Sequence, residues 1–200
     1  PDWRKLVGDG LPSAQMAQMA APPEGVCWGL QPGNSGTDPM RRPADVGRAD
    51  AGELRNPSDP DGWHEFPLTQ GVSFRRARRI DVIREPGGKI RVDAAFQDSA
   101  PRPDGGRAAV HEYRVEATID PETLEILSLE PEARILPFSE CPGAVDNARK
   151  LIGARIDEIR GEVLARLRGP AGCTHLNDAL RALAEVPRLA RYLDAAVIAC

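Results

Sequence analysis

Long apolar segments are missing from this chain of 200 residues. No apolar run approaches the roughly 20 residues that cross a bilayer as a helix, and no charged head followed by an apolar stretch marks a signal peptide. We therefore expect no membrane partner. Cysteine is scarce too, with four residues in all: Cys27, Cys141, Cys173 and Cys200. So few thiols do not form a disulfide framework, and we expect reduced cysteines and a cytoplasmic location.

The chain also lacks an excess of basic residues, because its formal net charge is −4. General nucleic-acid-binding domains typically show a basic face. One local basic run consists of Arg75, Arg76, Arg78 and Arg79, but it contains no aromatic residue on which bases could stack. We interpret this run as the solvated face of a strand and expect no nucleic-acid partner.

Two regions differ in composition. Residues 1–71 hold 10 of the 19 prolines, 10 of the 19 glycines and all three tryptophans, Trp3, Trp28 and Trp63. Few apolar periods interrupt their turn-rich sequence, so we predict an irregular extension that wraps the rest of the chain through its tryptophans. Residues 72–200 are predicted to form one domain.

The first half of that domain has the pattern of an antiparallel sheet. Polar and apolar residues alternate most regularly in residues 109–119, where His111, Val115 and Ile119 share the face that we expect to be buried. The connections are too short for crossovers, so three or four strands should form a meander. The expected strands cover residues 72–85, 90–98 and 109–119 and a segment that begins at 124.

The second half changes to a helical period, which makes the fold class α+β, with three to four helices packed on one face of the sheet. The apolar stripes of the first two helices include Ile152 and Leu164, and Thr174 is the expected N-cap of the third. Pro187 should kink or end that third helix, before a last short helix. The expected helices run from Pro142 to Gly153, from Ile156 to Leu167, from Thr174 to Pro187, and onward from Leu189.

Four residues form the predicted site. Cys141 and Cys173 each precede a helix, where the positive end of the helix dipole favours the thiolate form that binds metals or attacks electrophiles. His175 follows Cys173 by two residues, and His111 points inward from the most regular strand. Two sulfur and two nitrogen ligands suit zinc or mononuclear iron. The alternative is that both cysteines and His111 are ordinary core residues.

Asp98 is a further candidate. It lies on the same strand face as Ile90, Val92 and Ala94, so it can approach His111 if the two strands pair. There it would ligate the metal, orient His111 or act as a base. The alternative is an aspartate that starts a loop.

Three short motifs resemble a bacterial family that is known only as a domain of unknown function. Residues 172–176, Gly-Cys-Thr-His-Leu, are similar to a box near the end of that family, and Pro137 to Cys141 match its Pro-x-x-x-Cys element. Its His-Asp-Met box corresponds to His111-Glu112-Tyr113, in which only the histidine is kept. The resemblance covers roughly residues 74–184 and implies no activity.

A more distant resemblance is to the NifU-type iron–sulfur scaffold, which implies a NifU/SufE-like fold. The ligands of that scaffold come from an inner strand, the first helix after the sheet and a later helix. His111, Cys141, Cys173 and His175 follow the same order. Tyr113 stands where the scaffold has an aspartate and His111 where it has a cysteine, which favours a mononuclear metal over a bridging cluster.

Three functions compete with a purely structural role, in which the N-terminal extension forms an interface to a larger complex. The first is a metal-binding protein, with zinc or iron, which is an enzyme if it uses an open metal position. The second is an iron–sulfur scaffold or sulfur carrier. The third is a metal-free thiol enzyme with Cys173 as nucleophile and His111 as base, since residues two apart on a helix, such as Cys173 and His175, do not face each other. The partner, a small molecule or a protein, is not defined by the sequence, and a homo-oligomer is a further hypothesis.

Overall fold

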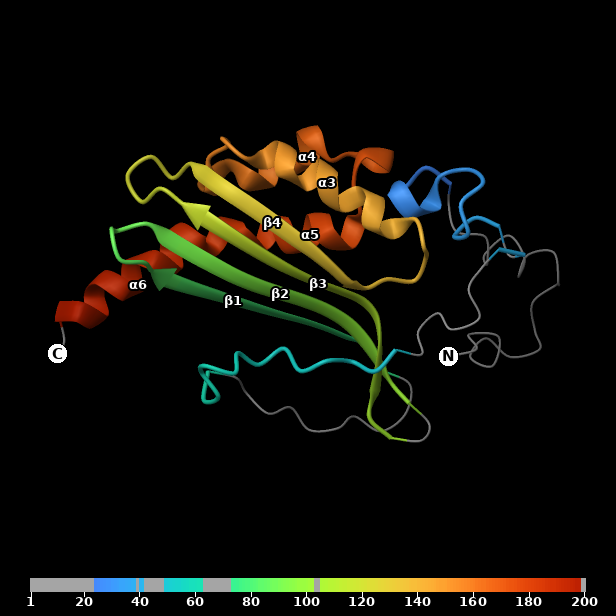
Figure 1. Cartoon of the computed structure of the whole chain (residues 1–200), viewed down its shortest axis with the longest axis horizontal. Coiled ribbons are helices and arrows are strands. Elements are labelled where there is room, and N and C mark those ends of the chain that lie inside the picture. Colours follow the sequence, from blue (N-terminus) through green and yellow to red (C-terminus); the bar gives the residue numbers. More distant parts are fainter. Residues whose placement is uncertain (1–23, 39, 42–48, 63–72, 103–104, 199–200) are drawn as a thin grey trace.

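A single four-stranded antiparallel sheet forms the centre of the protein (Figure 1). The computed structural model describes residues 24–38, 40–41, 49–62, 73–102 and 105–198. Neighbouring strands are neighbours in sequence, in the order β1-β2-β3-β4, so the predicted meander is confirmed. The strands are β1 (Arg75–Arg84), β2 (Ile90–Pro101), β3 (Arg107–Ile119) and β4 (Ile126–Ile135).

The α-helices follow the sheet in sequence and pack on one of its faces, as Figure 1 shows. This arrangement confirms the predicted α+β class. Among the described residues, none of the helices is long and apolar enough to cross a membrane. The α-helices are α3 (Val145–Ala148), α4 (Ile159–Arg166), α5 (Thr174–Ala182) and α6 (Val186–Ile198). The 3-10 helices are η1 (Trp28–Leu30), η2 (Cys141–Ala144), η3 (Arg149–Leu151), η4 (Ile156–Glu158), η5 (Gly169–Ala171) and η6 (Leu183–Glu185).

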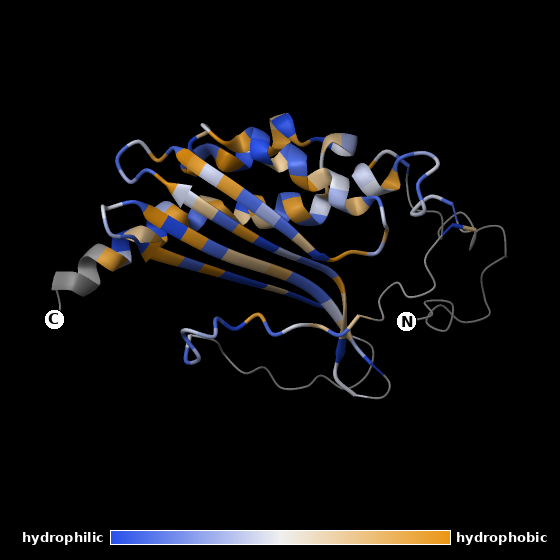
Figure 2. Ribbon diagram, viewed as in Figure 1, coloured by the Kyte–Doolittle hydropathy of each residue, from blue (hydrophilic) through white to orange (hydrophobic). Residues whose placement is uncertain are grey.

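Alternation along the strands decides which sheet face is covered, and Figure 2 shows the resulting bands of apolar and polar residues. On β3, Tyr113, Val115 and Ile119 are at most 1% exposed, whereas Glu116 on the other face is exposed. The prediction for this strand is therefore confirmed. The covered face and the helices form one core, whose largest members are Tyr113, Phe96, Ile119, Ile126, Leu129, Leu151, Ile156, Ile159, Leu167, Leu176, Leu180 and Leu183.

The strand β2 is longer than predicted and carries Asp98 in its interior, because it continues to Pro101. Asp98 pairs with His111, and Ser99 pairs with Ala109, so Val110 is an extra residue in β3. Such a bulge bends the strand and shifts the register by one residue. The alternative of an aspartate that starts a loop is therefore wrong, and Asp98 is 1% exposed.

The first helical region is less regular than its pattern predicts. It consists of η2, a single α-turn (α3) and η3, and the chain turns away at Gly153 with a φ of 84°. Because a 3-10 helix has three residues per turn, its buried positions shift to Cys141, Ala144, Ala148 and Leu151. Ile152, which the helical period assigns to the buried stripe, is 42% exposed.

Three further helix predictions need correction. Leu164 lies on the outer side of α4 and is 61% exposed. The N-cap of α5 is Cys173, in an extended conformation, and not Thr174. The predicted break before the last helix is present, but it lies at η6, and Pro187 belongs to the first turn of α6, which begins at Val186 and is 13 residues long.

Two described segments of the N-terminal region contact the domain. The backbone N–H of Trp28 donates to the Gly172 carbonyl at 2.8 Å, and the Trp28 side chain packs against the core. Residues 49–62 run along the sheet face that the helices leave open (Figure 1), where the Ala51 N–H donates to the Arg107 carbonyl at 2.9 Å. Trp3 and Trp63 lie outside the described residues.

Candidate metal centre

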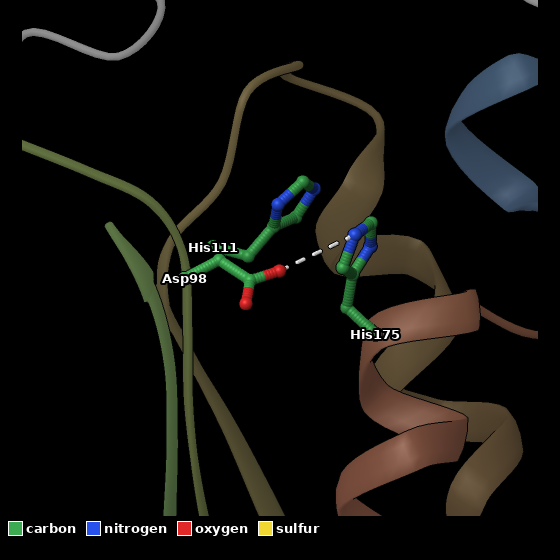
Figure 3. Close-up of side chains that lie close together, drawn as sticks. All are labelled: Asp98, His111 and His175. Carbon is green, nitrogen blue, oxygen red and sulfur yellow. Dashed lines mark ion pairs between the residues drawn. The ribbon is translucent and has the colours of Figure 1, made fainter. Parts of the chain in front are cut away.

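Three side chains from three elements converge at one end of the helix-covered sheet face (Figure 3). Asp98 belongs to β2, His111 to the neighbouring position of β3, and His175 to the first turn of α5. One ligand atom from each lies within 4.8 Å of the others. Among the described residues, no group of this kind includes Cys141 or Cys173.

The sheet register brings Asp98 and His111 together. Inward positions of β2 continue from Val92 and Phe96 to Asp98 with the period of two that a strand requires. A slip of one residue would move the carboxyl group to the opposite face. The site is therefore a continuation of the core face in which apolar side chains are replaced by ligand-type side chains.

The two imidazole rings are stacked and poorly solvated. Their centroids are 3.4 Å apart with an interplanar angle of 16°. Burial, with further lowering by the charge of His175, brings the pKa of His111 down to about 3. Burial also lowers the pKa of His175, against the opposing charge of Asp98. Both rings are thus neutral near pH 7, which is the form that binds a metal.

His111 has an unused polar atom. Its Nδ1 is buried and has no hydrogen-bond partner in the part of the chain that the structure describes. A buried polar atom without a partner lowers stability and is uncommon in folded proteins. A bound ligand would provide such a partner.

Asp98 is held by an arginine from the edge strand. Arg76 donates from Nε to Oδ1 at 2.8 Å and from Nη2 to Oδ2 at 2.7 Å. A carboxylate offers about four lone-pair positions, so this bidentate pair leaves others toward the histidines. Oδ2 lies 3.6 Å from Nε2 of His175, which is too long for a hydrogen bond.

Cys173 lies on the other side of the His175 ring. Its Sγ is 3.9 Å from Nδ1 of His175, and the buried Tyr113 hydroxyl donates to the same sulfur at 3.3 Å. Residues two apart on a helix face different directions, but Cys173 precedes the helix as its extended N-cap. This explains a contact that the sequence argument considered unfavourable.

Cys141 belongs to a buried group of cysteines beside the site, which also includes Cys173. Burial, with the charge of Cys173 as the next cause, raises its pKa to about 12. The prediction that a helix entry favours its thiolate was therefore wrong, because Cys141 begins a four-residue 3-10 helix and is 5% exposed. The chain at Gly29 approaches it so closely that a Cβ there would lie 2.5 Å from Sγ.

Cys27 was left out of the predicted site, yet the fold brings it into this group. It is 9% exposed, and burial and the charge of Cys173 raise its pKa. Its sequence spacing carries no ligand signal, and only the docking of residues 24–38 shows its position. Cys200 and His64 lie outside the described residues.

Residues 74–188 match the family described as "Protein of unknown function (DUF2889)". The chain belongs to this family. The matched region contains Asp98, His111, Cys141, Cys173 and His175. No curated protein and no solved structure matches the chain. The resemblance of residues 172–176 to the Gly-Cys-Thr-His-Leu box of a family therefore stays a prediction, and so does the NifU/SufE-like fold.

Proposed function

We propose that this protein binds one divalent transition metal ion through His111, His175 and Asp98 and uses the remaining coordination positions for a substrate. The observation that carries the proposal is the close approach of two neutral imidazoles and a buried carboxylate, with one ligand atom of each within 4.8 Å of the others. Two histidines and one carboxylate are typical of mononuclear iron(II) sites with open positions, and zinc also binds such ligands.

The separation of one ligand pair, His175 and Asp98, is compatible with this role. Ligands that bind one metal at 2.0–2.2 Å with a tetrahedral angle are roughly 3.3–3.6 Å apart. Nε2 of His175 and Oδ2 of Asp98 are separated by 3.6 Å. Cys173 beside Nδ1 of His175 suits the outer partner that commonly orients a ligating histidine.

Bound in this way, the metal would act as a Lewis acid or redox centre toward a substrate in its open positions. The residues of the chain have their own tasks. Arg76 keeps the carboxyl group of Asp98 oriented, and Phe96, 1% exposed, keeps water from one side of His175, with ring centroids 6.3 Å apart.

Metal analysis of the full chain, made without a histidine tag and loaded anaerobically with iron(II) or zinc, tests the proposal. We expect about one equivalent in the wild type and loss of binding in His111→Ala, His175→Ala and Asp98→Asn. Glu112→Gln is the matched control, because it removes a buried carboxylate from the opposite face of β3. Metal content that is negligible, or equal in all variants, would contradict the proposal.

The same measurement separates this ligand set from the predicted set of His111, Cys141, Cys173 and His175. Cobalt(II) loading reports thiolate ligands through intense charge-transfer absorption. We expect Cys141→Ser to retain metal and a weak spectrum without that absorption. Loss of metal in Cys141→Ser would instead support the four-residue set and would favour zinc.

A metal-free thiol enzyme is the second candidate, and one observation favours it. Cys173, His175 and Asp98 form a thiol–imidazole–carboxylate series with separations of 3.9 and 3.6 Å. His175 would be the base in place of His111. Rapid alkylation of Cys173 by iodoacetamide at pH 6, abolished by His175→Ala, would support this alternative. The scaffold or sulfur-carrier hypothesis stays a prediction, and a colourless protein after anaerobic iron–sulfur reconstitution would count against it.

A further inference from the structure

The rim of the candidate metal centre carries a cluster of arginines. On α5, His175, Asp178 and Arg181 recur every three residues and therefore share one side of the helix. On β1, Arg76 and Arg78 occupy the helix-covered sheet face, because they pair with Asp98 and Phe96 of β2. The edge strand and α5 thus direct polar side chains toward the same place.

These side chains are joined through one carboxylate. Oδ2 of Asp178 accepts from Arg78 Nη2 at 2.5 Å and from Arg76 Nη1 at 3.1 Å, and Oδ1 accepts from Arg181 Nη2 at 3.3 Å. Arg76 also holds Asp98. Three guanidinium groups therefore face two carboxylates, an excess of one positive charge before any metal is bound.

The cluster is open to solvent but held in place. The side chains of Arg76, Arg78 and Arg181 are 42%, 40% and 38% exposed. The Arg76 guanidinium lies 5.0 Å from the centroid of the Phe96 ring, which also makes an edge contact with His175. Surface ion pairs stabilise a fold by only about 0–1 kcal/mol, so stability is a weak reason to place three arginines on one aspartate.

Guanidinium groups bind planar oxyanions through paired N–H donors, which suits carboxylates and phosphates. Asp178 is such an oxyanion supplied by the chain itself. Arg76 donates both to Asp178 and to Asp98, so the arginine cluster is in direct contact with one of the proposed metal ligands.

We propose that Arg78 and Arg181, with Arg76 behind them, bind a carboxylate or phosphate group of the substrate, and that Asp178 occupies this anion site in the free protein. The role as a substrate site rests on the proposed function, since the reacting part of the substrate would occupy the open metal positions. The substrate is accordingly an anionic small molecule, with its charged group on the arginines and its reacting group toward His111 and His175.

The test is an NMR titration of the full chain with acetate and, separately, with inorganic phosphate, each against sodium chloride of equal ionic strength. The arginine Nε–H signals locate the binding. We expect at least one of the two anions to bind and the double variant Arg78→Ala/Arg181→Ala to weaken its binding about tenfold or more. Arg84→Ala is the matched control for each single variant, Arg78→Ala and Arg181→Ala, because it also removes one positive charge, at the far end of β1, and it should leave binding unchanged.

A gain of binding provides a second, independent readout. Asp178→Asn removes the internal competitor, so this variant should bind the anion several-fold more tightly than the wild type. Unchanged or weaker binding in Asp178→Asn, the same loss in Arg84→Ala, or no binding of either anion to the wild type would overturn the inference.

Metal content measured on the same samples separates the two proposals. A double variant that keeps its metal but loses the anion supports both of them. Anion binding to a wild-type protein that takes up no metal supports the anion site and overturns the metal function. Metal uptake without anion binding overturns only the inference about the arginines.

Discussion

The helix-covered face of the sheet has two ends with different chemistry. At one end Ile90 pairs with Ile119, and both are at most 2% exposed. Eight residues further along β2 the same face presents Asp98 opposite His111. The pairing of β2 with β3 and the alternation continue unbroken from Ile90 to Asp98, so the difference lies in the side chains and in what covers them. One end stabilises the fold, and the other holds polar groups that require partners.

The polar end depends on the edge strand for those partners. β1 changes along this face from Val82 and Ile80 to Arg78 and Arg76, and Arg76 neutralises Asp98. A buried carboxylate is tolerated only with such a partner. The comparison suggests that the apolar end provides the stability that permits a costly arrangement at the polar end.

The largest expected effect comes from the apolar end. Ile119→Ala should lower the free energy of unfolding by about 3–4 kcal/mol, because it leaves a cavity in a fully buried position. Urea denaturation of the metal-free protein measures this change. His111→Leu on the same strand face should leave stability unchanged or raise it, since it removes a buried nitrogen without a partner, and should abolish metal binding. Equal losses of unfolding free energy in Ile119→Ala and His111→Leu would contradict the view that the apolar end stabilises the fold and the polar end does not.

Removing the partner of Asp98 should have the next largest effect. Arg76→Ala should lower the free energy of unfolding by about 2 kcal/mol, which is less than for a fully buried pair because Arg76 is 42% exposed. The double variant Arg76→Ala/Asp98→Asn should recover part of the loss. A complete denaturation cycle over the two sites measures the coupling. Additive losses would show that the two side chains do not stabilise each other.

The stability of the metal-free protein should fall in mild acid. The pKa of His111 in the folded state is about 3, below its ordinary value of 6.5. The unfolded chain therefore binds a proton that the folded chain excludes, so stability is complete above pH 6.5 and decreases as the pH falls below it. Each such histidine contributes a slope of up to about 1.4 kcal/mol per pH unit.

Denaturation between pH 7 and about 5.5, above the range in which most carboxyl groups titrate, checks this dependence. His111→Leu should reduce the slope, and Ile119→Ala should shift the curve without changing its slope. A wild-type slope that is identical to that of His111→Leu would show that His111 does not titrate differently in the two states.

The smallest expected effect concerns the neighbouring thiols. With a pKa of about 12, Cys141 is almost entirely protonated at pH 8, and its sulfur is covered by Gly29. Iodoacetamide should therefore label Cys141 only in denaturant, as peptide mass spectrometry can show. Gly29→Ala, whose Cβ would meet this sulfur, should displace residues 24–38 and make Cys141 reactive. Fast labelling in the native wild type would contradict the burial of this group.

Much of the architecture follows from local pattern. Period-two alternation in residues 109–119 identified the buried face of β3, since side chains of a strand necessarily alternate. Helical periods located α4 and α5. The same periods wrongly predicted that Ile152 and Leu164 are buried. Ile152 follows a 3-10 helix, and Leu164 lies on the outer side of α4. Pro187 misled because proline is compatible with a first helical turn as well as with a helix end.

By itself the sequence determined the α+β meander, its buried face and the inward direction of His111, because these depend on periods within one element. Only the tertiary structure decided which residues meet. The register of β2 against β3 sets this carboxyl group opposite His111, α5 brings His175 onto them, and Cys141 is enclosed with Cys27 and Cys173. Such contacts depend on register, docking and burial between distant segments, and burial also sets the pKa values that a local pattern cannot reveal.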